Sequence, residues 1–266
     1  MNEQLSIFDL TDDVLSEILP TNERTNERTN ERTKHFIYSS QFKVPNIHFI
    51  NGDFREHLDF INHLPNVVIV TDPPFNIGYH YNEYSDDMND DDYYKMLSEL
   101  VKTYPSVIIH YPEALHRLSI ESHITPNRVV SWIYNSNTPR QHRDIAFYGV
   151  EPDFNLVKQP YKNQNDKRIQ ERIRRGLVGG RLYDWWNVNQ VKNVSKDKTE
   201  HPCQMPIEVM KNIVALLPKN STIVDTFMGS GTTAEACIDL GYDFVGCEIN
   251  KEYFEIAKTR INANES

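Results

Sequence analysis

Short apolar runs alternate with polar turns through most of this 266-residue chain. The apolar runs predict strands at residues 46–50, 67–70, 106–110, 128–134, 145–150, 221–225 and 243–247. Segments with helical spacing predict helices at residues 91–103, 206–217 and 234–240. Strands that alternate with helices are typical of an α/β fold with a mostly parallel sheet, so we expect one large α/β domain.

The first 33 residues do not follow this pattern. The tetrapeptide Thr21-Asn22-Glu23-Arg24 is repeated at Thr25 and again at Thr29. A repeat of four polar residues cannot bury a core, and its period matches no known solenoid. We therefore expect a flexible N-terminal segment over residues 1–33 and a folded domain over residues 34–266.

The predicted strand at 67–70 runs directly into Thr71-Asp72-Pro73-Pro74-Phe75-Asn76. Ligands of open α/β sheets lie at the carboxyl ends of strands. The two prolines stiffen this turn and remove two N–H donors, which leaves the Asp72 carboxylate, the Pro73 carbonyl and the Phe75 ring. That set suits a planar base with an exocyclic amine, because the two oxygens can accept its N–H groups while the ring stacks on its face.

A second candidate site follows the predicted strand at 221–225. Phe227-Met228-Gly229-Ser230-Gly231-Thr232-Thr233 is a glycine-rich turn at the start of a predicted helix, where free N–H groups are available. It lacks the lysine of a phosphate loop and the third glycine of the dinucleotide fingerprint. The next strand ends at Glu248, about 17 residues after Gly231, where an acidic side chain can bind ribose hydroxyls. This order favours a nucleoside cofactor such as S-adenosylmethionine.

Charge is unevenly distributed along the chain. From Arg128 to Lys198 there are fourteen Lys plus Arg and seven Asp plus Glu, a net +7, which leaves −17 on the rest of a chain whose formal net charge is −10. A basic segment on an acidic body is expected when one face meets phosphate. The polar loop at 135–143 and the aromatic cluster at Tyr183–Trp186 lie in this segment, although Trp185 and Trp186 also suit packing.

Composition excludes several classes of protein. No apolar run approaches the roughly 18 residues of a membrane span, and the N-terminus has no signal-peptide pattern, so we expect a cytoplasmic protein. Cys203, Cys237 and Cys247 have neither CxxC spacing nor histidine partners, so we predict no metal site and no disulfide framework.

Together these motifs resemble the permuted, β-type DNA amino-methyltransferases, which act on adenine N6 or cytosine N4. Asp72-Pro73-Pro74-Phe75 is similar to the family's (D/N/S)PP(Y/F/W) motif, residues 225–233 to its cofactor loop, and Glu248 to its ribose-binding acid. His201-Pro202-Cys203-Gln204-Met205-Pro206 is similar to its HPxQKP element, with Met205 in place of the lysine. Asn51-Gly52-Asp53 resembles the turn whose aspartate meets the cofactor's adenine. The catalytic motif precedes the cofactor loop, as in the β arrangement.

The resemblance implies a Rossmann-like methyltransferase fold with a sheet of about seven mostly parallel strands. It implies S-adenosylmethionine as cofactor and double-stranded DNA as partner, with direct transfer to adenine N6 of a flipped base. The implied catalytic residues are Asp72, Pro73, Pro74 and Phe75. The implied cofactor-binding residues are Asp53, His201, Gln204, Asp225, Phe227, Gly229, Ser230, Gly231, Thr232 and Glu248.

We predict that residues 135–200 form the target-recognition insertion. Its predicted DNA-binding residues are Arg140, His142, Arg143, Lys167, Arg168 and Arg172. The sequence has no nuclease motif, so a restriction endonuclease partner would be a separate polypeptide. Recognition sequence and oligomeric state stay open, with a homodimer as one alternative.

Other functions were weighed against this one. A cytosine-N4 methyltransferase shares the motifs but more often begins the catalytic motif with serine. Pro202-Cys203 matches the nucleophile of cytosine-C5 enzymes, but it lies inside the HPxQxP context. Protein and RNA methyltransferases with a related tetrapeptide usually place the cofactor loop first. A non-catalytic DNA-binding protein that keeps the fold is the alternative from a different class.

Overall fold

The computed structural model describes residues 37–38, 44–76, 80–81, 84–85, 88–177, 179–191 and 204–264. The repeats at 21–32 lie outside these residues, as do His201 and Cys203.

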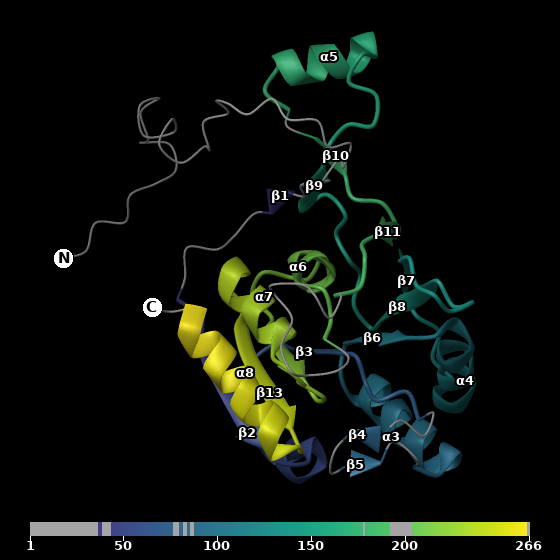
Figure 1. Cartoon of the computed structure of the whole chain (residues 1–266), viewed down its shortest axis with the longest axis vertical. Helices are drawn as coiled ribbons and strands as arrows, with labels where there is room; N and C mark the ends of the chain where they lie inside the picture. The colour runs from purple at the N-terminus through teal and green to yellow at the C-terminus, as the bar shows by residue number, and fades with distance from the viewer. Residues whose placement is uncertain are drawn as a thin grey trace, which may run out of the picture. The chain divides into compact units, whose positions relative to one another are not determined.

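A sheet of eight strands organises the domain (Figure 1). Its order is β11-β7-β8-β6-β3-β12-β13-β2, and only β8 runs antiparallel to its neighbours. The strands span β2 (Ile47–Asn51), β3 (Val67–Thr71), β6 (Ser106–His110), β7 (Arg128–Ile133), β8 (His142–Tyr148), β11 (Trp185–Asn187), β12 (Thr222–Asp225) and β13 (Asp243–Glu248). The predicted mostly parallel α/β fold is confirmed, with eight strands in place of about seven.

Helices cover both faces of this sheet. One face carries α6 (Ile207–Ala215), α7 (Thr232–Leu240) and α8 (Lys251–Asn264), and α7 contacts both of the others. The other carries η2 (Phe54–His57), α2 (Leu58–Asn62), α3 (Asp90–Thr103) and α4 (Pro112–Ser122). Strand side chains alternate between the layers: Val68 and Val70 pack with the α6–α8 side, whereas Ile69 packs with α2. Burial on both faces explains why β3 reads as an unbroken apolar run.

Two of the longer helices, α4 and α8, were not predicted from the sequence. Helix α4 begins with Pro112 at its first turn and ends where His123 takes a left-handed φ of 58°. Helix α8 buries Tyr253, Ala257 and Ile261, which recur every four residues. The spacing was present in the sequence, but polar residues dominate both segments and mask it.

The order of strands reverses beside β3. From β3 the chain continues to β6 on one side, and from β12 it continues to β13 on the other. Strands β3 and β12 are parallel neighbours, with Val224 opposite Ile69. Their carboxyl ends are therefore adjacent although about 150 residues separate them, at the type of switch point where α/β proteins bind ligands.

Smaller elements lie outside the main sheet. Strands β1 (Ile37–Tyr38), β9 (Val157–Gln159) and β10 (Gly180–Arg181) form an antiparallel sheet, and β4 (His80–Tyr81) pairs with β5 (Tyr84–Ser85). Helix α5 (Lys167–Arg174) buries none of its residues. Among the described residues, no helix combines the length and apolar character needed to cross a membrane.

Candidate active site

The turn after β3 carries the Asp-Pro-Pro-Phe motif. Thr71 is fully buried at the end of the strand, and the Asp72 side chain is 16% exposed. Burial raises the pKa of Asp72 to about 6, against the opposing effect of the Arg143 guanidinium, whose Nη1 lies 3.3 Å from Asp72 Oδ2. The other oxygen, Oδ1, is buried and has no hydrogen-bond partner within the described part of the chain. A buried acceptor without a partner lowers the stability of the folded protein unless another molecule supplies a hydrogen-bond donor.

A short hydrogen-bond chain holds this turn in place. The Tyr111 N–H donates to His110 Nδ1 (2.8 Å), so the ring proton of a neutral His110 lies on Nε2. That nitrogen is 2.9 Å from the Tyr93 hydroxyl, which donates to the Pro74 carbonyl (2.7 Å). Burial, with Arg143 and Arg140 nearby, lowers the pKa of His110 to about 3. A neutral His110 therefore anchors Pro74 and leaves the Pro73 carbonyl outside this chain.

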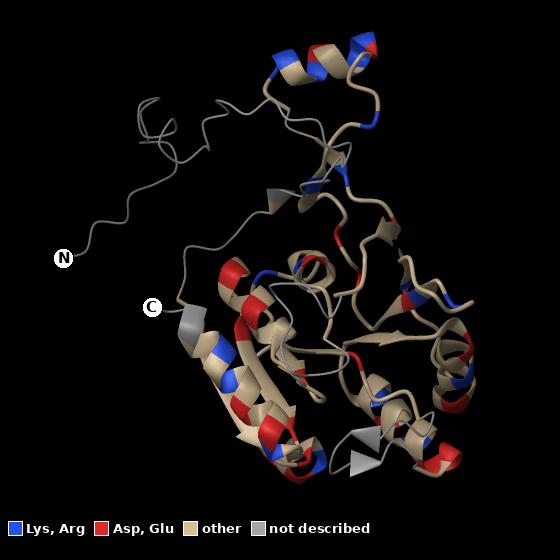
Figure 2. Ribbon diagram, viewed as in Figure 1, with Lys and Arg blue, Asp and Glu red and all other residues tan. Residues whose placement is uncertain are grey.

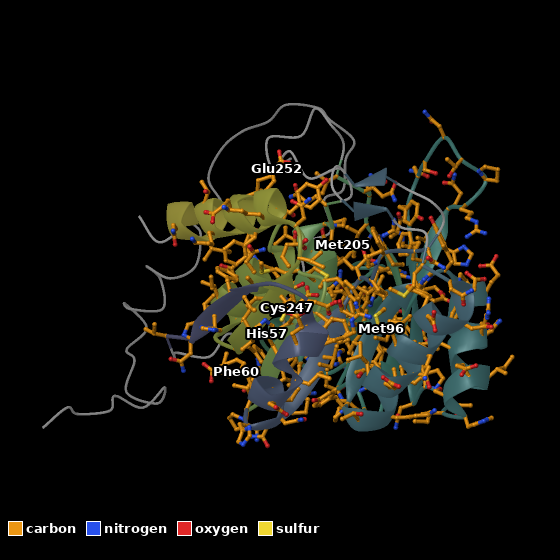
Figure 3. All side chains as sticks on the ribbon, turned by 90° about the horizontal axis from the view of Figure 1, so that it is seen from below. His57, Phe60, Met96, Met205, Cys247 and Glu252 are labelled. Carbon is orange, nitrogen blue, oxygen red and sulfur yellow. The ribbon has the colours of Figure 1, made fainter. Side chains whose placement is uncertain are left out.

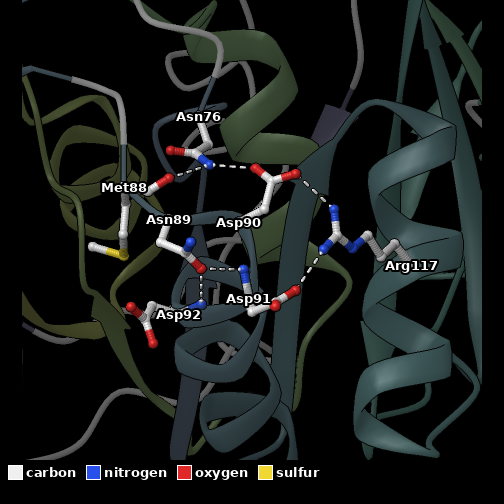
Figure 4. Close-up of polar contacts among 7 residues, drawn as sticks. All are labelled: Asn76, Met88, Asn89, Asp90, Asp91, Asp92 and Arg117. Carbon is white, nitrogen blue, oxygen red and sulfur yellow. Dashed lines mark hydrogen bonds and ion pairs between the residues drawn. The ribbon is translucent and has the colours of Figure 1, made fainter.

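Asn76 ends the turn with a left-handed φ of 54°. Its Nδ2 donates to the Met88 carbonyl (2.9 Å) and to Asp90 Oδ1 (2.8 Å), as Figure 4 shows. Arg117 of α4 in turn binds Asp90 and Asp91 at the start of α3. These contacts join the motif to α3.

The carboxylate of Asp225 joins the two motif-bearing strands. Its Oδ1 accepts from the Thr71 hydroxyl (2.8 Å) and the Phe227 N–H (3.1 Å), and its Oδ2 accepts from the Thr233 hydroxyl (2.5 Å). Asp225 is 3% exposed, and burial raises its pKa. The residue predicted to bind cofactor thus has both oxygens engaged inside the protein, where they tie β12 to β3.

Glu248 at the end of β13 supports the glycine-rich loop. Its Oε2 accepts from the Gly229 N–H and its Oε1 from the Asn250 N–H, both at 2.8 Å. Burial raises its pKa. Each carboxylate oxygen has more than one lone pair, so both can still accept a hydroxyl donor from the cavity.

Arg260 of α8 binds the other end of the same loop. Its Nη1 donates to the Ser230 carbonyl (3.2 Å) and to the Thr232 hydroxyl (2.9 Å), and its Nη2 pairs with Glu235. Gly231 begins α7 with a φ of 78°, and a Cβ there would lie 3.1 Å from Ala257 Cβ. Of the predicted loop residues, Gly231 does not line the cavity, because it faces α8.

Asp53 caps the short helix η2 by accepting from the Arg55 N–H (2.9 Å). The Arg55 guanidinium binds the same carboxylate and lowers its pKa. Asp53 therefore enters the cavity as an ionised group.

One cavity brings both motifs together. Its walls include Asp72–Phe75 from the catalytic turn and Asp53, Gln204, Asp225, Phe227, Gly229, Ser230, Thr232 and Glu248 from the predicted cofactor set. Met96, Met205 and Cys247 add apolar surface; Figure 3 labels these three. Met205, which stands where the resembled motif has lysine, is buried and its sulfur accepts from Arg143 Nη1 at 3.7 Å.

The residues predicted to bind DNA lie in three different environments. Lys167, Arg168 and Arg172 are exposed on α5, which Figure 2 shows as a helix rich in Lys and Arg. Arg140 and His142 are exposed at the start of β8. Arg143 is instead 8% exposed, and its predicted contact with DNA stays a prediction. It is buried because strand alternation turns it inward beside exposed His142.

Several residues of this site were missed from the sequence. His110, Tyr93 and Arg260 act through contacts between distant segments, and no local motif marks them. Trp186 is buried and donates to the Tyr183 carbonyl, whereas Trp185 is 38% exposed, so the aromatic cluster divides between packing and surface.

Residues 102–259 match the family model of the N6/N4 enzymes, which is described as DNA methylase. This match covers more than half of the chain. The chain belongs to the N6/N4 DNA methylase family. The resemblance predicted from the sequence motifs is confirmed, although the matched range begins after Asp72–Phe75.

Relatives in this family align over most of the chain. It is 27% identical over 224 residues to the type II methyltransferase M.HpaI of Haemophilus parainfluenzae, covering 74% of this chain and 68% of that protein. It is 26% identical over 243 residues to M.BglII of Bacillus subtilis, covering 78% and 66%. The DNA adenine methyltransferase YhdJ of Escherichia coli K12 is 25% identical over 243 residues, covering 80% and 82%. The chain thus spans about two thirds of the first two relatives.

Solved structures share the fold. The cytosine-N4-specific PvuII DNA methyltransferase matches with a TM-score of 0.55 at 14% identity, covering 85% of this chain and 90% of that one. M1.HpyAVI matches with a TM-score of 0.52 at 21% identity, covering 81% and 98%. At these identities the likeness concerns the fold.

Proposed function

We propose that the chain transfers a methyl group from S-adenosylmethionine to adenine N6 at a specific site in double-stranded DNA. The observation that carries this proposal is the single cavity at the carboxyl ends of β3, β12 and β13 that holds both motifs. Family membership and similarity to YhdJ, a DNA adenine methyltransferase, support it.

The cavity fits the cofactor in its hydrogen-bond acceptors and its apolar surface. Asp53 and Glu248 offer carboxylates for an amine and for ribose hydroxyls, and Phe227 and Ile249 offer apolar surface for a ring. Gln204 lies on the same wall, and His201 stays a predicted contact outside the described residues. When bound, the cofactor supplies an electrophilic methyl group.

The catalytic turn then orients the acceptor. The target base must leave the helix stack to reach the cavity, which costs a few kcal/mol. Asp72 Oδ1, which has no partner in the described residues, and the Pro73 carbonyl accept hydrogen bonds from the two N–H groups of the base's amine. The Phe75 ring stacks on the face of the base. These contacts direct the nitrogen lone pair away from the ring and toward the methyl group. An ionised Asp72 also stabilises the positive charge that grows on the nitrogen as the new N–C bond forms and the bond between the methyl carbon and the sulfonium sulfur breaks. The electron pair of the broken bond stays on the sulfur, and the methylated nitrogen then loses one proton to solvent.

Modification-sensitive sequencing tests this proposal. Unmethylated plasmid is incubated with the purified protein and S-adenosylmethionine, beside an Asp72→Ala variant whose cofactor binding is checked by calorimetry. N6-methyladenine confined to one short motif and absent with the variant is the expected result. If the product were N4-methylcytosine, the target base would be cytosine and not adenine. If the protein bound the cofactor but modified no base, the proposal of a DNA substrate would be contradicted.

Partners beyond DNA stay predictions. The type II names of M.HpaI and M.BglII belong to those proteins, and a separate endonuclease or a homodimer is a hypothesis for this one. Co-purification from the native host and light scattering of the pure chain test the two hypotheses.

A further inference from the structure

Arg143 contacts two residues to which the proposed mechanism assigns the target base. Its guanidinium carbon is 4.5 Å from the centroid of the Phe75 ring, and its Nη1 is 3.3 Å from Asp72 Oδ2. The side chain is 10% exposed, so it is buried beside Asp72 and Phe75, two residues that line the cavity. Its remaining contacts include the ring of Trp132 at 5.4 Å and the sulfur of Met205 at 3.7 Å.

These contacts resemble those of an aminated base. A guanidinium is planar, stacks on aromatic rings and donates N–H bonds in its own plane. It contacts the Phe75 ring and Oδ2 of the carboxylate whose Oδ1 would accept from the base amine. At 4.5 Å there is no room for a second planar group between the guanidinium and the Phe75 ring, so a base that stacks on this face of Phe75 and the guanidinium exclude each other.

We propose that Arg143 is a placeholder for the target base: its guanidinium occupies the base position between Asp72 and Phe75 in the DNA-free protein and withdraws when the base enters. This inference rests on the proposed function. Arg143 is then a positioning residue that holds the base position, and keeps Asp72 ionised, until DNA binds.

A second aromatic ring, that of Tyr111, lies close enough to receive the Arg143 guanidinium when it leaves Phe75. The Tyr111 ring lies 4.9 Å from the Phe75 ring and 5.9 Å from the Arg143 guanidinium. The guanidinium carbon of exposed Arg140 lies 4.3 Å from the centroid of the Tyr111 ring, so this ring can stack with a guanidinium. Arg143 can thus leave Phe75 without losing all aromatic contact.

The placeholder also controls the charge of Asp72. Arg143 lowers the pKa of this carboxyl, while burial and the neighbouring Asp225 raise it. From the other packed elements, His110 of β6 faces the motif as a neutral ring, and Tyr134 after β7 has a raised pKa. Arg143 is therefore the cation that keeps Asp72 ionised near neutral pH in the DNA-free protein.

Kinetics against pH separate a placeholder from a permanent contact. In a plot of log kcat/KM against pH, the fall on the acidic side (the acidic limb) gives the pKa of the essential group in the free enzyme. The acidic limb of the kcat plot gives the pKa of that group in the DNA complex. We expect Arg143→Met to move the kcat/KM limb upward by about one pH unit, roughly tenfold in kcat/KM at acidic pH, and to leave the kcat limb in place. Arg143→Lys retains the charge and should keep both limbs near those of the unchanged protein.

Arg140→Met serves as the matched control on the neighbouring exposed arginine. It should raise KM for DNA without moving either limb. Equal movement of both limbs in Arg143→Met would mean that Arg143 stays beside Asp72 in the complex, and no movement would mean that it does not act on Asp72. Either result overturns the proposal.

A second measurement needs no activity. The carboxyl carbon of Asp72, assigned in ¹³C-aspartate-labelled protein by comparison with Asp72→Asn, is titrated by NMR without DNA. Its midpoint should rise in Arg143→Met, with unchanged cofactor binding as the test of folding. An unmoved midpoint contradicts the inference, whereas a moved midpoint in a protein that modifies no DNA would refute only the proposed reaction.

Discussion

The carboxylates on the two sides of the cavity differ in how completely their oxygens are hydrogen-bonded. Around the glycine-rich loop, Asp225 and Glu248 have all four oxygens bonded to hydroxyl or N–H groups of the protein. In the Asp-Pro-Pro-Phe turn, Asp72 has one oxygen beside Arg143 and one buried oxygen with no partner in the described residues. A carboxylate bonded at both oxygens holds its loop in place, whereas a buried oxygen without a donor costs free energy that a bound donor recovers. We therefore expect the loop to be the more rigid side and the turn to be the side that exchanges partners.

Asp72→Asn should show the largest effect on turnover. It keeps the shape of the side chain but removes the charge that stabilises the methylated amine, so kcat should fall by about 10²–10³-fold. Cofactor affinity, measured by calorimetry, should stay within about twofold because the opposite wall is untouched. A variant with near-normal kcat would remove Asp72 from the mechanism.

Asp225→Ala should act on stability. It leaves the buried hydroxyls of Thr71 and Thr233 without their acceptor and should cost about 2–4 kcal/mol of unfolding free energy, measured with urea. Asp239→Asn, which removes a partly exposed ion pair with Lys211, is the control and should cost less than about 1 kcal/mol. If the two variants were equally stable, the link between β3 and β12 would carry no stability.

His110→Gln sharpens the contrast through pH. The pKa of His110 is lowered in the folded protein to about 3, so the unfolded chain binds a proton below pH 6.5 that the folded protein does not. Its stabilising contribution is complete above that pH and is lost as pH falls, by about 1.4 kcal/mol per unit. Unfolding at pH 7.5, 6.0 and 5.0 should therefore show a shallower loss in His110→Gln than in the unchanged protein, and parallel curves would contradict a neutral His110.

Charge removal on α5 should give the smallest change. Lys167→Gln and Arg172→Gln should each weaken DNA binding several-fold and reduce the dependence of log K on log salt by about one if each contacts a phosphate. Arg117→Gln removes a cation that pairs with Asp90 and Asp91 and should leave that slope unchanged. An unchanged slope in all three would exclude α5 from the DNA contact.

Local sequence was enough to predict the α/β fold, most strands of the main sheet, and the residues Asp72, Gly229 and Glu248, because strand burial and tight turns leave their mark within a few neighbouring residues. It failed for α4 and α8, whose buried positions are sparse among polar ones. It also gave no sign that Arg143 is buried, because strand alternation decides which side a residue faces, and only pairing with β6 and β7 turns this one toward Asp72.

Tertiary structure decided how the two motifs work together. The adjacency of β3 and β12, the Thr71–Asp225 contact and the His110–Tyr93–Pro74 chain all join segments far apart in sequence. Whether a buried carboxylate is satisfied depends on which donors the fold brings within hydrogen-bond distance, and a motif lists only the acceptor. For that reason the candidate residues could be named from the chain, while the unpaired oxygen of Asp72 and the guanidinium beside it were visible only in three dimensions.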